Sequence, residues 1–306
     1  MAKAVRFEEY GGVEVLQVVE VPVPEPGAGE VLVKVKAASI NPGEARIRTG
    51  ELHGRWPTTF PSGEGSDFAG VVDKLGPGVS GFAVGDEVIG FTNRRASHAE
   101  YVVAESGDLT SKPANVSWEV AGSLFVAGTT AYAAVRAVAL KPGETVAVSG
   151  AAGGVGSLVV QLAKAAGAEV IGIASPGNHE WLAAHGVKPV AYGEGLADRL
   201  RAAADRVDAF IDTHGDGYVK LAIEDLGVDP SRIDTVADFA AVEQYGVKAE
   251  GNGAAATAEV VAELAALVAD GRLEVRIART FPLDQVRAAF EEVEQGHARG
   301  KIVLLP

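Results

Sequence analysis

The sequence predicts an α/β protein in which a β-rich domain, formed by both ends of the chain, brackets a domain of alternating strands and helices. Residues 1–119 hold short β-rich runs between Pro- and Gly-rich segments, as in a compact β-barrel. Residues 120–266 alternate apolar strand-like runs with helical ones, which predicts a doubly wound parallel sheet with helices on both faces. Residues 267–306 return to the first pattern and are expected to complete the barrel.

The elements follow from these patterns in chain order. The barrel strands are expected at Val31–Ser39, Phe68–Gly76 and Asp86–Phe91, where β-branched residues are frequent. Six strands are expected in the parallel sheet, in the runs TVAVSG, EVIGIAS, PVAY, VDAFIDT, RIDTVA and KAEG. Helices are expected in SLVVQLAKAAG and HEWLAAHG, over Leu196–Ala204 and Thr257–Asp270, and in a segment through Glu292.

Composition excludes several classes of protein. A chain of 306 residues with 47% hydrophobic content can bury a core and suggests two domains. Its net charge of −14 argues against nucleic-acid binding, and the absence of cysteine excludes disulfides and thiolate metal sites. Polar residues and glycines interrupt the most apolar window, Val120–Leu140, so no membrane span is expected. The first residues do not resemble a signal peptide, and we expect a cytoplasmic protein.

A glycine-rich turn between a strand and a helix predicts a dinucleotide site. Thr145–Ser149 is apolar and β-branched like a central parallel strand, and Ser157–Ala166 has helical spacing. Glycines between them would let the main chain approach a diphosphate, while the helix N-terminus offers N–H groups and a positive dipole end. A purely structural glycine turn is the alternative. The predicted contact residues are Ala152, Gly153, Gly154, Val155 and Gly156.

The end of the second strand favours NADPH over NADH. An acidic residue there would bind the ribose 2′-hydroxyl of NAD and repel a 2′-phosphate, but this chain has Ser175. Asn178 and His179 follow and could donate to a phosphate. Glu180 would weaken this interpretation if it faced the ribose. A simple helix-capping loop is the alternative, and both interpretations can hold together.

Several ordered motifs carry a family resemblance over nearly the whole chain. They are AASINPGEARIRTG, FPSGEGSDFAGVVDKLGPGVSGFAVGDEVIGF, HAEYVV, AGTTAYAAV, SGAAGGVG and FPLDQVRAAFEEVEQGHARGKIVL. Together they resemble the medium-chain dehydrogenase/reductase superfamily, and within it the zinc-free, zeta-crystallin-like quinone oxidoreductase branch. The resemblance implies a GroES-like catalytic β-barrel domain, a Rossmann domain, a homodimer, and hydride transfer from NADPH to quinones or activated alkenes.

The residues predict that no zinc is bound. Zinc-dependent relatives carry a Cys near the position of Asn41 and a His near Ser66, and they have a Glu where this chain has Asp67. Zinc prefers Cys and His in tetrahedral sites. The six histidines show no paired spacing, and His98 is expected to be a packed barrel residue; they are His53, His98, His179, His185, His214 and His297.

The resemblance also assigns residues to the site. It places Asn41 at the nicotinamide ribose, Thr129 at the nicotinamide edge and Tyr192 near the 2′-phosphate. Their structural alternatives are a turn residue, a helix hydroxyl and a strand aromatic. Related quinone reductases often carry tyrosines where this chain has Arg46 and Leu52, so a phenol donor is missing. Arg46 is a candidate donor to the substrate oxygen, with an ordinary surface charge as the alternative.

The leading functional hypothesis is an NADPH-dependent, zinc-independent reductase of quinones or α,β-unsaturated carbonyl compounds. The alternatives are an enoyl-thioester reductase of a biosynthetic pathway and a non-catalytic NADPH-binding protein. A homodimer, as implied by the resemblance, would pair the strand at Val247–Gly251 with its symmetry mate.

Overall fold

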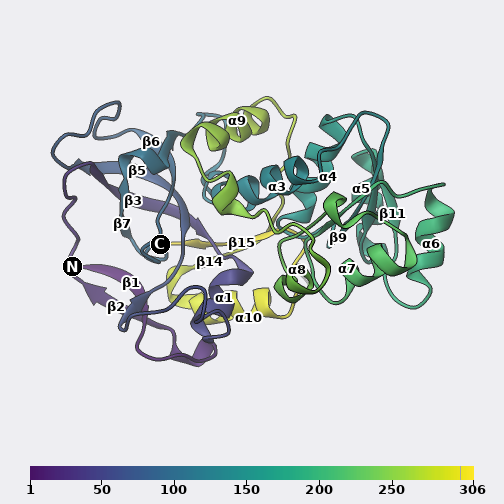
Figure 1. The fold of residues 1–306 in the computed structure, drawn as a ribbon. Helices are drawn as coiled ribbons and strands as arrows, with labels where there is room; N and C mark the ends of the chain where they lie inside the picture. Colours follow the sequence, from purple (N-terminus) through teal and green to yellow (C-terminus); the bar gives the residue numbers. More distant parts are fainter. Residues whose placement is uncertain (297) are drawn as a thin grey trace. The chain divides into compact units, whose positions relative to one another are not determined.

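The computed structural model describes residues 1–296 and 298–306, which form two compact units (Figure 1). The first unit comprises Met1–Val126 and Thr257–Pro306, and the second comprises Ala127–Ala256. Both ends of the chain therefore belong to one unit, and the α/β class is as predicted. None of the helices in the described residues is long and apolar enough to cross a membrane.

The first unit is built mainly from antiparallel strands. One sheet has the order β2-β1-β4, and a larger one has the order β14-β15-β3-β5-β6-β8, with β7 also paired to β3. Only the pair β14 and β15 is parallel among the described strands of this unit. The strands are β1 Ala2–Phe7, β2 Gln17–Val21, β3 Glu30–Ser39, β4 Ser62–Gly63, β5 Asp67–Leu75, β6 Glu87–Phe91, β7 Tyr101–Glu105, β8 Leu109–Ser111, β14 Ile277–Pro282 and β15 Lys301–Leu305. The helices are α1 Pro42–Arg48, α2 Trp118–Ala121, α9 Ala258–Ala269 and α10 Val286–Glu294, and α3 Phe125–Ala137 leads into the second unit.

The last strand closes the first unit. β15 lies between β14 and β3, with Val303 opposite Ser39 and Leu304 opposite Ala38 (Figure 1). Next to this pairing, the N–H of Ile40 donates to the carbonyl of Ile302 at 2.9 Å. The chain end is thereby held beside the residues that begin α1, which places Lys301 next to Asn41.

The second unit contains a five-stranded parallel sheet of order β11-β10-β9-β12-β13. The chain runs outward from β9 through β10 and β11, then returns to β12 on the other side of β9. Ligands bind such sheets where the order reverses, at the carboxyl ends of the strands, which here means the ends of β9 and β12. The strands are β9 Thr145–Ser149, β10 Glu169–Ile173, β11 Lys188–Val190, β12 Ala209–Asp212 and β13 Ile233–Thr235. The helices are α4 Gly156–Ala165, α5 His179–Ala184, α6 Leu196–Ala203, α7 Tyr218–Lys220 and α8 Phe239–Tyr245, with a π-helix at Leu221–Asp225.

The prediction of a sixth parallel strand at Val247–Gly251 is wrong. Lys248 makes an isolated bridge to Asp234, and the residues after it form no ladder. The N–H of Glu250 donates instead to the side chain of Asp234 at 2.7 Å, so a carboxylate takes the place of a strand carbonyl. The strand that the dimer hypothesis pairs across a two-fold axis is therefore absent from this unit.

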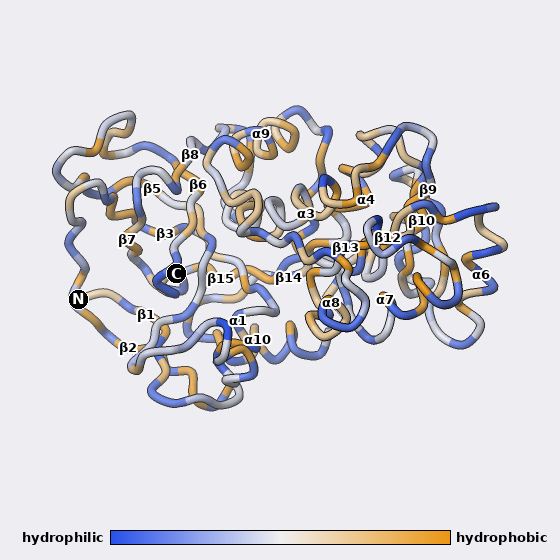
Figure 2. The backbone as a smooth tube through the Cα atoms, viewed as in Figure 1, coloured by the Kyte–Doolittle hydropathy of each residue, from blue (hydrophilic) through white to orange (hydrophobic). Residues whose placement is uncertain are grey.

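Each unit has its own apolar core. The strands of the parallel sheet carry hydrophobic stretches in Figure 2, and Ile171, Phe210 and Ile233 are buried there in one cluster. In the first unit, Phe290 of α10 and Leu304 of β15 belong to another buried cluster. Burial of such side chains is the dominant favourable contribution to folding.

Shortening Leu304 tests the role of the last strand. Leu304 is fully buried, so Leu304→Ala should lower the free energy of unfolding by roughly 2–5 kcal/mol. Val84 is 64% exposed, and Val84→Ala should change it by less than about 0.5 kcal/mol. Urea unfolding of both variants measures the difference; equal stabilities would show that β15 does not contribute to the core.

Candidate active site

In the glycine turn between β9 and α4, the start of the turn lies very close to the start of the helix. Gly150 has a φ of 58°, in the left-handed region that favours glycine. Its carbonyl accepts the N–H of Gly153 at 2.9 Å, which folds the turn back toward the strand. A Cβ on Gly156 would lie 2.2 Å from that same carbonyl oxygen. Gly156 is therefore required by the packing of helix α4 against the turn.

Gly153 is less crowded than Gly156. A Cβ on Gly153 would meet only the Gly150 oxygen, at 3.2 Å. The backbone N–H groups of Gly154 and Val155 have no hydrogen-bond partner within residues 1–296 and 298–306. Free N–H groups beside an open glycine at a helix start form a site for an anionic group. This chemistry fits the diphosphate of a dinucleotide.

A buried carboxylate ties together the strand ends around this turn. Asp212, at the end of β12, accepts a hydrogen bond from the Ser149 hydroxyl of β9. It also accepts from the N–H of Gly215 at 2.9 Å and from the hydroxyl of Thr235, the last residue of β13, at 2.8 Å. Three adjacent strands are thus cross-linked at their carboxyl ends, which holds the floor of the predicted dinucleotide site in place.

The loop after β10 carries the predicted selectivity residues. Nδ2 of Asn178 donates to Oγ of Ser175 at 3.0 Å, and a ring nitrogen of His179 lies 3.3 Å from the Ala174 carbonyl oxygen. Asn178 is buried, and its Oδ1 has no hydrogen-bond partner among the described residues. Asn178 also has backbone contact with this turn, since its N–H donates to the Ser175 carbonyl. Ser175 and Asn178 occupy N-cap positions, but neither side chain makes a cap hydrogen bond, and one buried polar atom is left unused.

Tyr192 lies on an exposed loop that an arginine organises. The Tyr192 side chain is 54% exposed. Around it, the guanidinium of Arg199 donates to the carbonyls of Ala191, Gly193 and Glu194 at 2.7–3.0 Å. Arg199 thus holds the loop on either side of the ring, which leaves Tyr192 free to face solvent or a ligand.

In the first unit, Asn41 is the centre of a buried polar cluster. It precedes Pro42 and has an extended backbone, as residues before proline prefer. Its N–H donates to the Glu44 carboxylate at 2.9 Å, in the manner of a capping box. Its side-chain amide donates to Oε1 of Glu44 at 3.2 Å and to Oδ1 of Asp67 at 3.1 Å. Nζ of Lys301 donates to its Oδ1 at 2.6 Å.

Burial controls the charges of this cluster. Burial raises the pKa of Glu44, against the lowering effect of hydrogen bonds from Asn41. It likewise raises the pKa of Asp67 and lowers that of Lys301, whose ammonium is in turn favoured by those two carboxylates. Burial and then the charge of Glu44 raise the pKa of Glu64 to about 8. One buried ammonium thus offsets a group of carboxyls, of which Glu64 keeps its proton at neutral pH.

His98 is a packed residue in this surrounding. Its Nε2 lies 3.1 Å from the Ser39 carbonyl oxygen, and its ring meets that of Phe290 edge-on with centroids 5.8 Å apart. Burial lowers its pKa to about 4. The imidazole is therefore neutral near pH 7, which does not suit an acid catalyst.

The two other predicted catalytic residues lie in separate surroundings. Thr129 is fully buried in α3. The Arg46 guanidinium is one-third exposed and forms an ion pair with Glu51 at 2.7 Å. This pairing favours the surface-charge alternative for Arg46.

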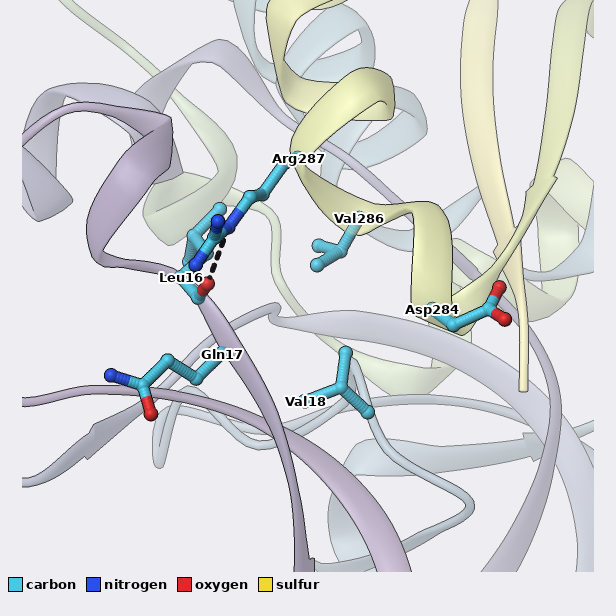
Figure 3. A pocket seen from close by; sticks show the side chains of 6 residues that line it. All are labelled: Leu16, Gln17, Val18, Asp284, Val286 and Arg287. Atoms are coloured by element: carbon cyan, nitrogen blue, oxygen red, sulfur yellow. Dashed lines mark hydrogen bonds between the residues drawn. The ribbon is translucent and has the colours of Figure 1, made fainter.

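None of the predicted site residues lines a pocket of about 340 Å³ in the first unit. Val18 and Val286 line it, and the Arg287 guanidinium closes one side by donating to the Leu16 carbonyl at 2.8 Å (Figure 3). Its other charged residue is Asp284. It offers neither a glycine turn nor a buried polar group, and we do not assign it to the active site.

Comparison with known proteins identifies the family. Two family models match, the alcohol dehydrogenase GroES-like domain over residues 27–180 and the zinc-binding dehydrogenase over residues 185–304. The quinone oxidoreductase of Pongo abelii is 31% identical across 100% of this chain and 98% of its own length. The chain belongs to the medium-chain dehydrogenase/reductase superfamily, in its quinone oxidoreductase branch.

Other members agree with this assignment. The NADPH-dependent alkenal/one oxidoreductase of Arabidopsis thaliana is 31% identical over 99% of this chain and 79% of its own. The quinone oxidoreductase of Coxiella burnetii superposes with a TM-score of 0.89 at 33% identity, covering 100% of this chain and 99% of that one. The Escherichia coli quinone oxidoreductase complexed with NADPH gives 0.85 at 27% identity, with 99% and 100% coverage. The GroES-like domain and the Rossmann-type sheet of the family are thus both present.

This quinone oxidoreductase-like chain does not fit a zinc ion, despite the name of one matching model. Asn41 and Ser66 stand where zinc-dependent relatives have ligands, and the Asp67 carboxylate accepts from Asn41 and from the Ser39 hydroxyl. The ammonium of Lys301 already supplies a cation beside that carboxylate. Over residues 1–296 and 298–306, no three His, Cys, Asp or Glu side chains are grouped to hold a metal, and His297 lies outside the described residues.

Sequence reasoning missed two members of the Asn41 cluster, Glu44 and Lys301, and it missed Glu64, whose pKa the charge of Glu44 helps to raise. The spacing of Asn41 and Glu44 is a capping-box signature and could have identified Glu44. Lys301 opens the apolar run KIVLLP, where a lysine normally marks an exposed strand end. Its burial depends on pairing with β3, which is distant in the sequence.

The pKa of Glu64 predicts a pH dependence of stability. The unfolded carboxyl titrates near 4.5 and the folded one near 8, so between these values only the folded state retains the proton. Stability must then fall as pH rises through this window. Glu64→Gln mimics the protonated acid, and its stability relative to the parent should increase by up to about 1.4 kcal/mol per pH unit. Urea unfolding at several pH values measures this; a constant difference from pH 5 to 8 would contradict a protonated Glu64.

Proposed function

We propose that the protein uses NADPH to reduce quinones or α,β-unsaturated carbonyl compounds without zinc. The observation that carries this is the turn after β9, where the N–H groups of Gly154 and Val155 have no hydrogen-bond partner among the described residues. It lies at the carboxyl end of the parallel sheet, where such sheets bind dinucleotides. Membership of the quinone oxidoreductase branch supports a reductase that uses a nicotinamide cofactor.

The loop after β10 supports NADPH as the cofactor. Oγ of Ser175 accepts from Asn178, so its own proton is available to a ligand. If the Asn178 amide turned over, its oxygen would accept from Ser175 and its NH₂ group would be free to donate to a phosphate. No carboxylate stands at the Ser175 position itself. We assign the 2′-phosphate to Ser175, Asn178 and His179, with Tyr192 beside it.

The residues of the chain position the reactants, while bound NADPH would supply the hydride. Oδ1 of Asn41 accepts a hydrogen bond from a hydroxyl of the nicotinamide ribose, and Thr129 lies along the nicotinamide edge. Correct placement of two reactants can by itself lower a barrier by several kcal/mol, on the order of 7–11 kcal/mol in well-oriented systems. Arg46 is the candidate hydrogen-bond donor to the substrate oxygen. To donate there, its guanidinium would give up one of its contacts with Glu51.

The same residues favour conjugated acceptors. Lys301, Asn41 and Asp67 satisfy one another where zinc-dependent relatives hold a metal, so no Lewis acid polarises a carbonyl there. A quinone or enone takes hydride at a conjugated carbon and spreads the developing charge to its oxygen. Hydrogen-bond donors and proximity suffice for such substrates. Reduction of isolated ketones is not expected.

Two glycine variants separate cofactor binding from folding. Gly153→Ala places a methyl group 3.2 Å from the Gly150 carbonyl oxygen and should weaken NADPH binding at least about tenfold, or about 1.4 kcal/mol, with a smaller loss of stability than Gly156→Ala. Gly156→Ala forces a methyl group onto the Gly150 carbonyl and should lower the unfolding free energy by roughly 1–3 kcal/mol or more. Gly253→Ala, where nothing lies within 4 Å, is the control. Calorimetric titration and thermal unfolding report the two effects; unchanged NADPH affinity in Gly153→Ala would remove this turn from the cofactor site.

A panel of acceptors tests the reaction itself. NADPH consumption is followed with 9,10-phenanthrenequinone, an alkenal, an enoyl thioester and a saturated ketone, and mass spectrometry identifies the products. We expect turnover with the quinone or the alkenal, none with the ketone, and slower turnover with NADH. Exclusive reduction of the thioester would instead establish an enoyl-thioester reductase. Tight NADPH binding without turnover of any acceptor would leave a non-catalytic binding protein.

A further inference from the structure

The least expected feature of the first unit is a buried lysine aimed at a predicted cofactor-contacting residue. Lys301 is 4% exposed, and its Nζ donates to Oδ1 of Asn41 at 2.6 Å and to the carbonyl of Ile40 at 3.1 Å. Removing an ammonium group from water is costly and requires compensation by nearby charges and hydrogen bonds. The carboxylates of Glu44 and Asp67 supply the charges.

The hydrogen bonds fix the Asn41 amide in one orientation. Both hydrogens of Nδ2 are used, one on Glu44 and one on Asp67. Oδ1 uses one lone pair on Lys301 and keeps the other. The reversed orientation would point the NH₂ group at an ammonium and the oxygen at two carboxylates, so donors would face donors and acceptors would face acceptors. The side chain can therefore offer a ligand only an acceptor.

We infer that Lys301 is a positioning residue, which holds Asn41 as a hydrogen-bond acceptor for a hydroxyl of the nicotinamide ribose. The inference rests on the proposed function, because it assumes that Asn41 contacts the cofactor. It goes further by specifying the polarity of the contact and the residue that sets it. The ammonium also polarises the amide, which strengthens the partial positive charge on Nδ2 toward the carboxylates and stiffens the whole arrangement.

A purely structural lysine is the competing explanation, and Lys112 provides the comparison. Lys112 is also buried in the first unit, with its Nζ 2.9 Å from a Glu87 carboxylate oxygen and 4.6 Å from the ring centre of Trp118. It contacts Glu87, Trp118 and the carbonyl of Pro113, and not Asn41. Lys301→Met and Lys112→Met remove the same charge from similar surroundings, so both should lower stability, and only the first should alter cofactor binding.

The experiment is a double-mutant cycle on NADPH affinity. The dissociation constant is measured by calorimetry for the parent, Lys301→Met, Asn41→Ala and the double variant, with Lys112→Met as the control and thermal unfolding recorded for each. We expect Lys301→Met to raise the dissociation constant about tenfold in the parent but less than about twofold in Asn41→Ala, because its effect passes through Asn41. Lys112→Met should stay within about twofold of the parent.

A conservative variant protects the test against loss of folding. Lys301→Arg keeps the charge and a donor and should recover part of the affinity that Lys301→Met loses. Equal losses in both backgrounds, or an unchanged affinity in a folded Lys301→Met, would overturn the inference.

The outcomes also separate this inference from the proposed function. Coupled losses of affinity without turnover of any acceptor would support the role of Lys301 and reject the proposed reaction. Turnover of an acceptor without coupling between Lys301 and Asn41 would support the proposed reaction and reject the role of Lys301. An absence of NADPH binding by the parent would defeat both.

Discussion

Helix α4 meets the turn after β9 at a distance that allows no side chain at Gly156, and the predicted cofactor site depends on this contact. The Gly150 carbonyl is used within the turn, and the N–H groups of Gly154 and Val155 have no hydrogen-bond partner among the described residues. Asp212 holds the neighbouring strand ends in register with the turn. An anion site made of backbone needs such rigidity, because its affinity comes from dipoles that are already aligned.

The first unit is organised by a different constraint, the compensation of buried charge. The side chain of Asn41 is hydrogen-bonded to Glu44, Asp67 and Lys301. Only one lone pair of its amide oxygen is not used by these bonds. A buried polar network destabilises the folded state when some of its hydrogen bonds are missing, and it fixes one arrangement of side chains when all of them are made. The same completeness explains why a metal has no place here. The fixed positive charge of the cluster is an ammonium, and it acts on protein groups rather than on a substrate oxygen.

Both constraints favour a reaction that depends on how the cofactor and the substrate are positioned. Family membership establishes an oxidoreductase scaffold, and the residues around Asn41 contain no electrophile that could activate an isolated carbonyl. The tyrosines found in many related quinone reductases are replaced by Arg46 and Leu52, and Arg46 is engaged with Glu51. Under the proposed function, reduction would depend on the reactivity of a conjugated acceptor and on the orientation of the cofactor, for which we propose Asn41.

The sequence by itself determined the two kinds of sheet, most helix positions and the glycine turn, because these follow from local periodicity and from glycine spacing. It also pointed to Asn41 through motif resemblance. It failed at Val247–Gly251, where a strand-like run loses its ladder because the Asp234 side chain takes the N–H of Glu250. Only the tertiary structure placed Lys301, since its burial requires β15 to pair with β3 across most of the chain. Contacts between residues so distant in sequence leave no local pattern, and the orientation of the Asn41 amide is decided by such contacts.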